Sequence, residues 1–175
     1  MKLKFSLLAV LISSISMFGQ NFEKLLYSKK NQPTIIINEK IIANWEMINS
    51  LPKDAIKEIR VMKSKQADSY AKSDPNLSAY GLILCKADVG KLETKTQKEI
   101  RQFLGADVNT KIYIDGFLLK DETHLIATKS IKEIEFISPN EEDLNEEKII
   151  IIWTLTKDKR LASSDRSKNE VQKNN

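Results

Sequence analysis

The sequence predicts an α+β fold built from two tandem small units of mixed sheet with short helices, joined by a linker helix. The first observation is an internal repeat, in which a β-branched strand, a variable segment, a second strand, a polar loop and a closing apolar strand occur twice. The tetrad Ile-Lys-Glu-Ile is identical in both copies, at 56–59 and 131–134. The second is a capping-box sequence between the copies, Thr96 to Glu99, which predicts a helix. A repeat of this length indicates a duplicated small fold.

The first unit is expected to span 33–90. Its strands are predicted at 35–37, 41–42, 58–62 and 80–86, from β-branched runs separated by turn residues. A short helix is predicted at 44–51, because Trp45, Ile48 and Leu51 are three residues apart and share one face. Trp45 is either part of the core or an exposed anchor for a partner. Asp54 is expected to cap one further turn, and a short helix is expected at 66–72.

The linker helix is expected within 91–106, where Gly105 supplies the stop. The second unit is expected to span 107–157, with strands at 112–114, 117–119, 131–137 and 148–155. Asp115-Gly116 predicts a two-residue hairpin, since both residues tolerate a positive φ. A shorter helix or turn is expected at 121–127 and an acidic loop at 139–147. The run at 149–153 is apolar on both faces, so we expect a central, covered strand.

The ends of the chain predict export. Residues 1–19 have the basic start, apolar middle and small residues of a secretory signal peptide, with an uncleaved anchor as the alternative. An N-terminal arm is expected at 20–32, and a disordered tail at 158–175. This pattern predicts secretion across the inner membrane into the periplasm, with association with the outer membrane as an alternative.

The charge pattern excludes one class of partner. The net charge is +4, and it falls to +2 if Lys2 and Lys4 leave with the signal peptide. Lysines are interspersed among acidic residues without a basic stripe, which does not indicate binding to nucleic acid. The single cysteine, Cys85, is expected to be a small buried side chain, with a reactive thiol as the alternative.

No catalytic or cofactor-binding pattern is found in the sequence. His124 is the only histidine, and it lacks the separated partners that a metal site needs, so we expect it at the surface. The acidic loop has no glycine for a calcium-binding bend, and the five glycines of the chain do not form a phosphate-binding loop. The sequence therefore predicts a protein without enzymatic activity, metal or cofactor.

The order of motifs resembles the plug domain of TonB-dependent outer-membrane receptors. The resemblance is carried by the strand at 35–37, the segment 51–63 from Leu-Pro to Met-Lys, Tyr70, and the closing strand 81–86, and it covers about 33–157. It implies two plug-like units. Asn38-Glu39 replaces the Asp-Gly of that family in the first unit, and after residue 157 only a polar tail follows. We therefore expect a free-standing pair of plug-like units without a barrel, and the transport role does not carry over.

Two functions are compatible with these features. The first is a protein-interaction module of the cell envelope that binds a protein partner through a sheet edge or the Trp45 helix. The second is a periplasmic protein that binds a small ligand, such as an iron chelate, cofactor or glycan, in a cleft lined by aromatic residues. The candidate contacts are aromatic: Trp45, Tyr70, Tyr80, Tyr113 and Trp153. The oligomeric state is left open by the sequence.

Overall fold

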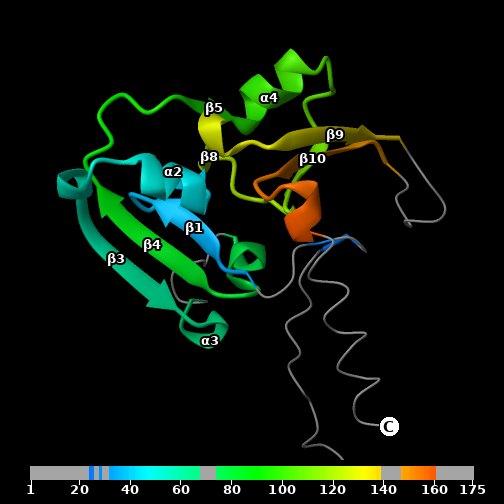
Figure 1. Cartoon of the computed structure of the whole chain (residues 1–175). Helices are drawn as coiled ribbons and strands as arrows, with labels where there is room; N and C mark the ends of the chain where they lie inside the picture. The colour runs from blue at the N-terminus through cyan, green and yellow to red at the C-terminus, as the bar shows by residue number, and fades with distance from the viewer. Residues whose placement is uncertain (1–23, 26–27, 29–31, 68–73, 139–146, 161–175) are drawn as a thin grey trace, which may run out of the picture.

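The computed structural model describes residues 24–25, 28, 32–67, 74–138 and 147–160 (Figure 1). In chain order the elements are β1 (Thr34–Ile37), β2 (Ile41–Ala43), α2 (Trp45–Ser50), η1 (Lys53–Ala55), β3 (Ile56–Met62), α3 (Ser64–Ala67), η2 (Pro75–Ser78), β4 (Leu82–Ala87), β5 (Thr94–Thr96), α4 (Gln97–Phe103), β6 (Lys111–Ile114), β7 (Phe117–Leu118), β8 (Leu125–Ala127), η3 (Thr128–Ser130), β9 (Glu133–Ile137) and β10 (Ile149–Trp153). The mixed sheets and short helices confirm the predicted α+β class.

The strands form two sheets. The first has six strands in the order β3-β4-β1-β2-β8-β5, and the second has four in the order β7-β6-β10-β9. In the first sheet β1 pairs antiparallel with β2 and parallel with β4, and β4 pairs antiparallel with β3. In the second sheet β6 has the same relation to β7 and β10, and β10 to β9. The repeated sequence therefore folds into two copies of one strand arrangement.

In each copy the turn after the first strand is held by side-chain hydrogen bonds to the end of the closing strand, but the side chain differs between the copies. Asn38 and Asp115 both have a positive φ, at 49° and 50°. The Asn38 side chain donates to the carbonyl of Ala87 and accepts from its amide, at 2.9 and 3.0 Å. The Asp115 carboxylate accepts from the amide and the hydroxyl of Thr154, both at 2.7 Å. Each turn residue thus ties the hairpin to the end of the closing parallel strand.

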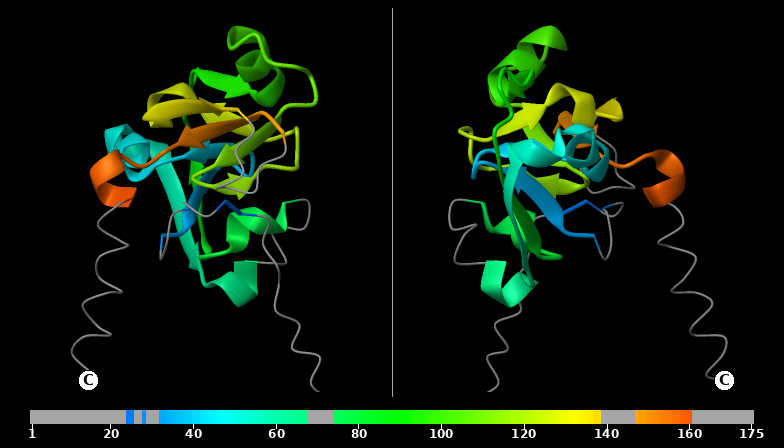
Figure 2. Two further views of the ribbon diagram at one scale, coloured as in Figure 1. Left: turned by 90° about the vertical axis from the view of Figure 1, so that its right-hand side faces the viewer. Right: turned by 60° about the vertical axis from the view of Figure 1, so that its left-hand side comes forward.

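Figures 1 and 2 show the arrangement of the strands and helices. Three apolar clusters stabilise it. The largest lies between the two sheets, where Ile36, Ile42 and Leu82 of the first sheet pack with side chains of β6 and β10. A second cluster lies on the other side of the first sheet, beneath Met47 and Ile48 of α2. The third, on the outer side of β10, consists of Ile149, Ile151 and Trp153 with partly buried Leu25, Tyr113 and Ile137. The strand at 149–153 is central and entirely buried, as the sequence predicted.

The two copies differ in the element that packs on the equivalent face of their first strands, β1 and β6. In the first copy Ile35 and Ile37 of β1 face α2. Their counterparts in the second copy, Ile112 and Ile114 of β6, face the back of the first sheet. Among the described residues between β7 and β9 there is the short 3-10 helix η3 but no α-helix, so the first sheet takes the place of α2. Each copy would expose a large apolar surface alone, which gives the duplication a physical reason.

The structure corrects several sequence-based boundaries. Within 91–106 only α4 is an α-helix, and the preceding residues form β5. The expected helix or turn at 121–127 ends in a strand, β8, which pairs in parallel with β2 and joins the second copy to the first sheet. The expected tail at 158–175 begins with ordered residues, because residues 157–160 form a helical turn. The signal segment 1–19, most of the helix expected at 66–72 and most of the acidic loop lie outside the described residues.

The linker helix itself forms as predicted. The Thr96 hydroxyl accepts from the amide of Glu99 at 3.1 Å, and the Glu99 carboxylate accepts from the amide of Thr96 at 2.7 Å. The hydrogen bond from the Thr96 amide, and then one from the Thr96 hydroxyl to the same carboxylate at 2.9 Å, hold the pKa of Glu99 below its usual value. Ile100 is buried in the core between the sheets, so α4 packs against both copies rather than only connecting them. Gly105 has a φ of 63° at the end of the helix, where such a conformation favours glycine.

Candidate protein interface

The longest exposed sheet edge is β3. It lies at one end of the first sheet and, among the described residues, pairs only with β4, so no described strand lies beside its outer backbone groups. Ile59 and Val61 lie opposite Cys85 and Ile83 of β4, on the face that α2 covers further along the sheet. They remain 44% and 69% exposed, because α2 does not reach over the edge strand. The edge therefore combines open backbone groups with two exposed apolar side chains.

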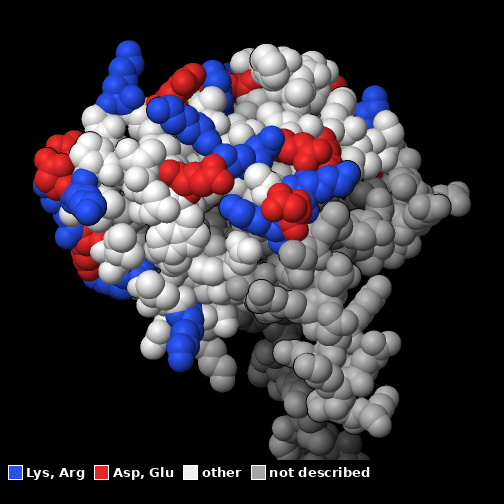
Figure 3. Space-filling model, in the orientation of Figure 1, with Lys and Arg blue, Asp and Glu red and all other residues white. Residues whose placement is uncertain are grey.

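Trp45 adds a third exposed apolar side chain on the same side of the sheet. It is the first residue of α2 and is 47% exposed, whereas Met47 and Ile48 of the same helix are buried. The structure therefore does not place Trp45 in the core, and its role as an anchor for a partner stays a prediction. Trp45, Ile59 and Val61 are called the α2–β3 face below. In Figure 3 uncharged atoms cover much of the surface over α2 and β4, and charged side chains surround them.

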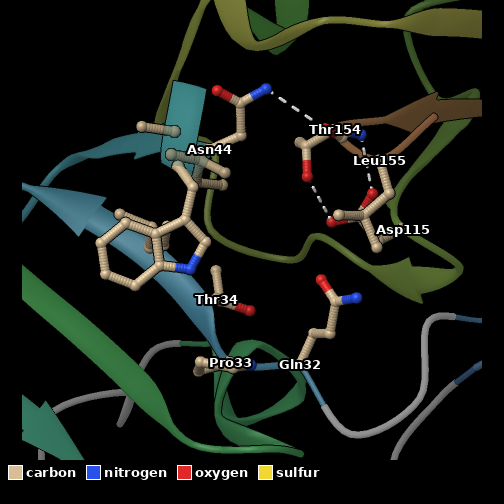
Figure 4. Close-up of a pocket in the computed structure, with 11 residues that line it drawn as sticks. Gln32, Pro33, Thr34, Asn44, Asp115, Thr154 and Leu155 are labelled. Atoms are coloured by element: carbon tan, nitrogen blue, oxygen red, sulfur yellow. Dashed lines mark hydrogen bonds between the residues drawn. The ribbon is translucent and has the colours of Figure 1, made fainter. Parts of the chain in front are cut away.

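Asn44 fixes the position of α2 and thus of Trp45 (Figure 4). Its side-chain oxygen accepts from the amide of Met47 at 2.9 Å and caps the helix. Its side-chain nitrogen donates to the carbonyls of Ser130 and Thr154, at 3.3 and 3.2 Å. The side chain is buried, and it connects the helix of the first copy to the backbone of the second. The orientation of the α2–β3 face therefore depends on both copies.

A small pocket lies beside Trp45 (Figure 4). It is lined by residues of β1, β2 and the ends of β6 and β10: Gln32, Pro33, Thr34, Ile35, Ile42, Ala43, Asn44, Trp45, Asp115, Thr154 and Leu155. Its buried polar groups are already used, since Asp115 is bonded to Thr154 and Asn44 to the neighbouring carbonyls. With a volume of about 20 Å³, the pocket has room for little more than one water molecule, so it does not by itself indicate a ligand.

Charged groups lie on the opposite face of β3. Glu58 pairs with Arg60 at 2.7 Å and with Lys86 of β4 at 3.4 Å. The hydrogen bond from Arg60, and then its charge, hold the pKa of Glu58 below its usual value. The edge strand therefore has an apolar face with Ile59 and Val61 and an ionic face with one negative and one positive residue.

The structure separates the remaining aromatic candidates. Trp153 is 4% exposed and buried beneath Arg160, whose guanidinium lies 4.1 Å from the ring centre. The expectation that Trp153 contacts a partner is therefore wrong, because the helical turn that follows β10 covers it. Tyr113 packs in the same outer cluster, whereas Tyr80 makes an edge contact with Phe117 at 5.9 Å. Tyr70 lies outside the described residues. The pocket beside Trp45 contains none of these four residues.

The expectation that His124 lies at the surface is wrong, because the residue is only 8% exposed. Its Nδ1 lies 3.2 Å from the carbonyl of Lys40, and β8 begins at the next residue, so the pairing of β8 with β2 buries it. Cys85 is 1% exposed, which confirms the expectation of a small buried side chain. Burial raises the pKa of its thiol. Among the described residues no group of three or more histidines, cysteines and carboxylates could hold a metal ion.

Asp74 is a buried carboxylate that the sequence did not single out. One oxygen accepts from the amides of Lys120 and Asp121, at 2.8 and 3.3 Å, and the other has no hydrogen-bond partner among the described residues. Burial raises the pKa of Asp74, and the two amides oppose this effect only in part. Asp74 therefore ties the segment before β4 to the turn before β8 at an electrostatic cost.

This arrangement predicts a pH dependence. A raised pKa means that the folded protein binds the proton more tightly, so the contribution of Asp74 to stability falls as the pH rises above about 4. The Tm of Asp74→Asn, relative to that of wild type, should therefore increase between about pH 4 and pH 7. Thermal unfolding followed by circular dichroism tests this, with the exposed Asp107→Asn as the control. A difference independent of pH would contradict the assignment.

The residues that sequence reasoning missed are Ile59 and Val61 as exposed side chains. Their alternation with Glu58 and Arg60 predicted opposite faces, but not that the apolar face would lack a cover. The available signal was the density of charge, because Lys57, Glu58 and Arg60 lie within one strand, which is typical of an edge.

No protein-family model, curated protein or solved structure matches this chain. The likeness to receptor plug domains therefore remains a prediction from the sequence motifs. None of the helices in the described part of the chain has the length and apolar character needed to cross a membrane.

Proposed function

We propose that this chain is a non-enzymatic secreted protein of the cell envelope that acts as a protein-interaction module. The α2–β3 face is the surface that binds an envelope protein partner. The observation that carries the proposal is the presence of exposed Trp45, Ile59 and Val61 on the side of the first sheet that carries α2. Clustered exposed apolar side chains, and tryptophan in particular, are typical of contact surfaces.

The sequence supports the remaining parts of the proposal. Residues 1–19 have the pattern of a secretory signal, which favours the periplasm as the compartment. The order of motifs resembles that of plug domains, which favours an envelope protein as the partner.

The test is site-specific photocrosslinking in the cells that produce the protein. A photoreactive amino acid replaces Val61 in one variant and Val108 in another, because both valines are exposed, at 69% and 74%, and Val108 lies outside the α2–β3 face. We expect a reproducible adduct with one envelope protein from position 61 and none from position 108. No adduct from position 61, or equal adducts from both, would contradict the proposal.

A substitution connects the adduct to the surface. Trp45→Ala should reduce the affinity for the captured partner by about 30-fold, the effect of losing a central aromatic anchor. The matched control is Phe103→Ala, which removes an aromatic side chain that is 83% exposed at the end of α4. An unchanged yield with Trp45→Ala would exclude the tryptophan from the interface. An adduct of twice the chain mass belongs to self-pairing, which is considered next.

A further inference from the structure

The outer edge of β3 carries charges that complement a second copy of themselves. Glu58 and Arg60 are the residues before and after Ile59 in β3. Both lie on the ionic face, where they supply one negative and one positive charge. When two identical strands pair antiparallel about a twofold axis perpendicular to the sheet, the residue at the axis lies opposite its own copy. With Ile59 at the axis, Glu58 of each strand lies opposite Arg60 of the other. Directly opposite residues of unlike charge stabilise a strand pair.

We propose that two copies of the chain associate through their β3 strands, antiparallel, with Ile59 opposite Ile59. The two sheets then become one continuous sheet across the axis. The two Ile59 side chains, each 44% exposed in the single chain, meet on the face that carries α2. Both α2–β3 faces lie on the same side of the joined sheet, so the dimer presents two binding surfaces in one orientation.

The charges select this register over its neighbours. A shift that places Arg60 at the axis sets Arg60 against Arg60, and a shift that places Glu58 there sets Glu58 against Glu58. A register displaced by one residue would place the ionic side chains of one strand on the apolar face of the other. Only the register centred on Ile59 combines apolar contact on one face with two ion pairs on the other.

The second copy of the repeat provides an internal comparison. Its edge strand β9 has the same tetrad, but Glu135 occupies the position that Arg60 holds in β3. Pairing of β9 with itself about Ile134 would set Glu133 against Glu135 twice. These two carboxylates are instead bonded to Arg160 of the same chain, with 3.5 Å between Arg160 Nη1 and Glu135 Oε1. The repeat thus has one edge suited to self-pairing and one that is not.

The first test exchanges the charges. The dissociation constant of the wild-type dimer is measured by analytical ultracentrifugation of the mature chain. Arg60→Glu and Glu58→Arg should each raise this constant about tenfold or more, because like charges then lie opposite each other twice. Mixed in equal amounts, the two variants should form a heterodimer with near wild-type affinity, since every pair is again of unlike sign. Lys111→Glu, which breaks the exposed pair of Lys111 with Glu147, is the control that should leave the constant unchanged.

The mixture distinguishes pairing between chains from the ion pair within one chain. Each variant alone loses the internal bond of Glu58 to Arg60, and mixing does not restore that bond. Recovery on mixing therefore shows that the charges meet across the axis. A monomeric wild-type chain at about millimolar concentration, or variants that stay apart when mixed, would overturn the proposal.

The second test fixes the register. In a Cys85→Ala background, which prevents a bond to the neighbouring strand, Ile59→Cys should form an interchain disulfide. Residues opposite each other in antiparallel strands have Cα atoms about 4.5 to 5.5 Å apart, within the range of a disulfide. Val61→Cys should not form one, because its own copy would lie about 13 Å further along the strand. Equal crosslinking from both positions would overturn the register.

Self-pairing and the binding of an envelope partner can fail independently. Arg60 lies on the face of β3 opposite to that of α2, so Arg60→Glu should weaken the dimer and retain the partner binding that depends on Trp45. Trp45→Ala should weaken partner binding and leave the dimer intact. A chain that dimerises but captures no partner would therefore contradict only the proposed function.

Discussion

Replacing Asp115 with alanine is expected to lower the free energy of unfolding by about 3 kcal/mol or more. The carboxylate is 2% exposed and accepts two hydrogen bonds from Thr154, so its removal leaves a buried amide and a buried hydroxyl without these bonds. Alanine must also adopt the φ of 50°, which favours asparagine, aspartate and glycine. Urea unfolding monitored by circular dichroism measures the effect, and a loss below about 1 kcal/mol would contradict it.

The two copies of the turn supply a sharper comparison. Asp115→Asn should cost less than Asp115→Ala, because the amide oxygen still accepts from the amide of Thr154, the amide nitrogen can donate to the Thr154 hydroxyl, and asparagine tolerates the same backbone. The reverse change in the first copy, Asn38→Asp, should cost more. The Asn38 side chain donates to the carbonyl of Ala87, and a carboxylate has no proton to donate there. Equal effects of the two substitutions would show that the turns are not chemically distinct.

Replacing Asn44 with alanine is expected to lower the free energy of unfolding by about 2 to 3 kcal/mol. The substitution removes the cap of α2 and leaves the carbonyls of Ser130 and Thr154 without the donor that they have in the folded chain. Because α2 carries Trp45, the same variant should also weaken crosslinking from the α2–β3 face.

The control for this variant is Asn49→Ala on the same helix. Asn49 is exposed, and its replacement should change the free energy of unfolding by less than about 0.5 kcal/mol. Thermal and urea unfolding of both variants, measured together, separate the loss of the cap from the general effect of alanine in α2. If the two variants lose the same stability, the contacts of Asn44 with the second copy contribute nothing measurable.

The sequence was sufficient to predict the elements that local chemistry determines. The turns at 38–40 and 115–116, the capping box of α4 and the covered strand β10 all depend on residues close together in the chain, and each forms as expected. The edge position of β3 was not predicted, because it depends on how distant segments of the chain pair, and local sequence does not show that pairing.

Long-range pairing explains the remaining differences. Residues 125–127 are too few to show a strand period, and they form β8 only because β2 lies beside them. That pairing also buries His124. Trp45 was placed by its spacing on the buried face of a helix, but a helix of six residues beside a sheet cannot cover all of its apolar side chains. The sequence could therefore indicate that aromatic side chains contact a partner, but it could not show which side chains lie together on one exposed surface.

The packing of the second copy on the back of the first limits how further copies of the unit could be added. Repeat arrays extend because each new unit packs on its predecessor as its predecessor packed on the one before. Here the front of the first copy is occupied by α2, and Arg160 and the partly buried Leu25 pack on the back of the second. Both outer faces of the stack are therefore covered, so a third unit that packed in the same way would have to displace either α2 or Leu25 and Arg160.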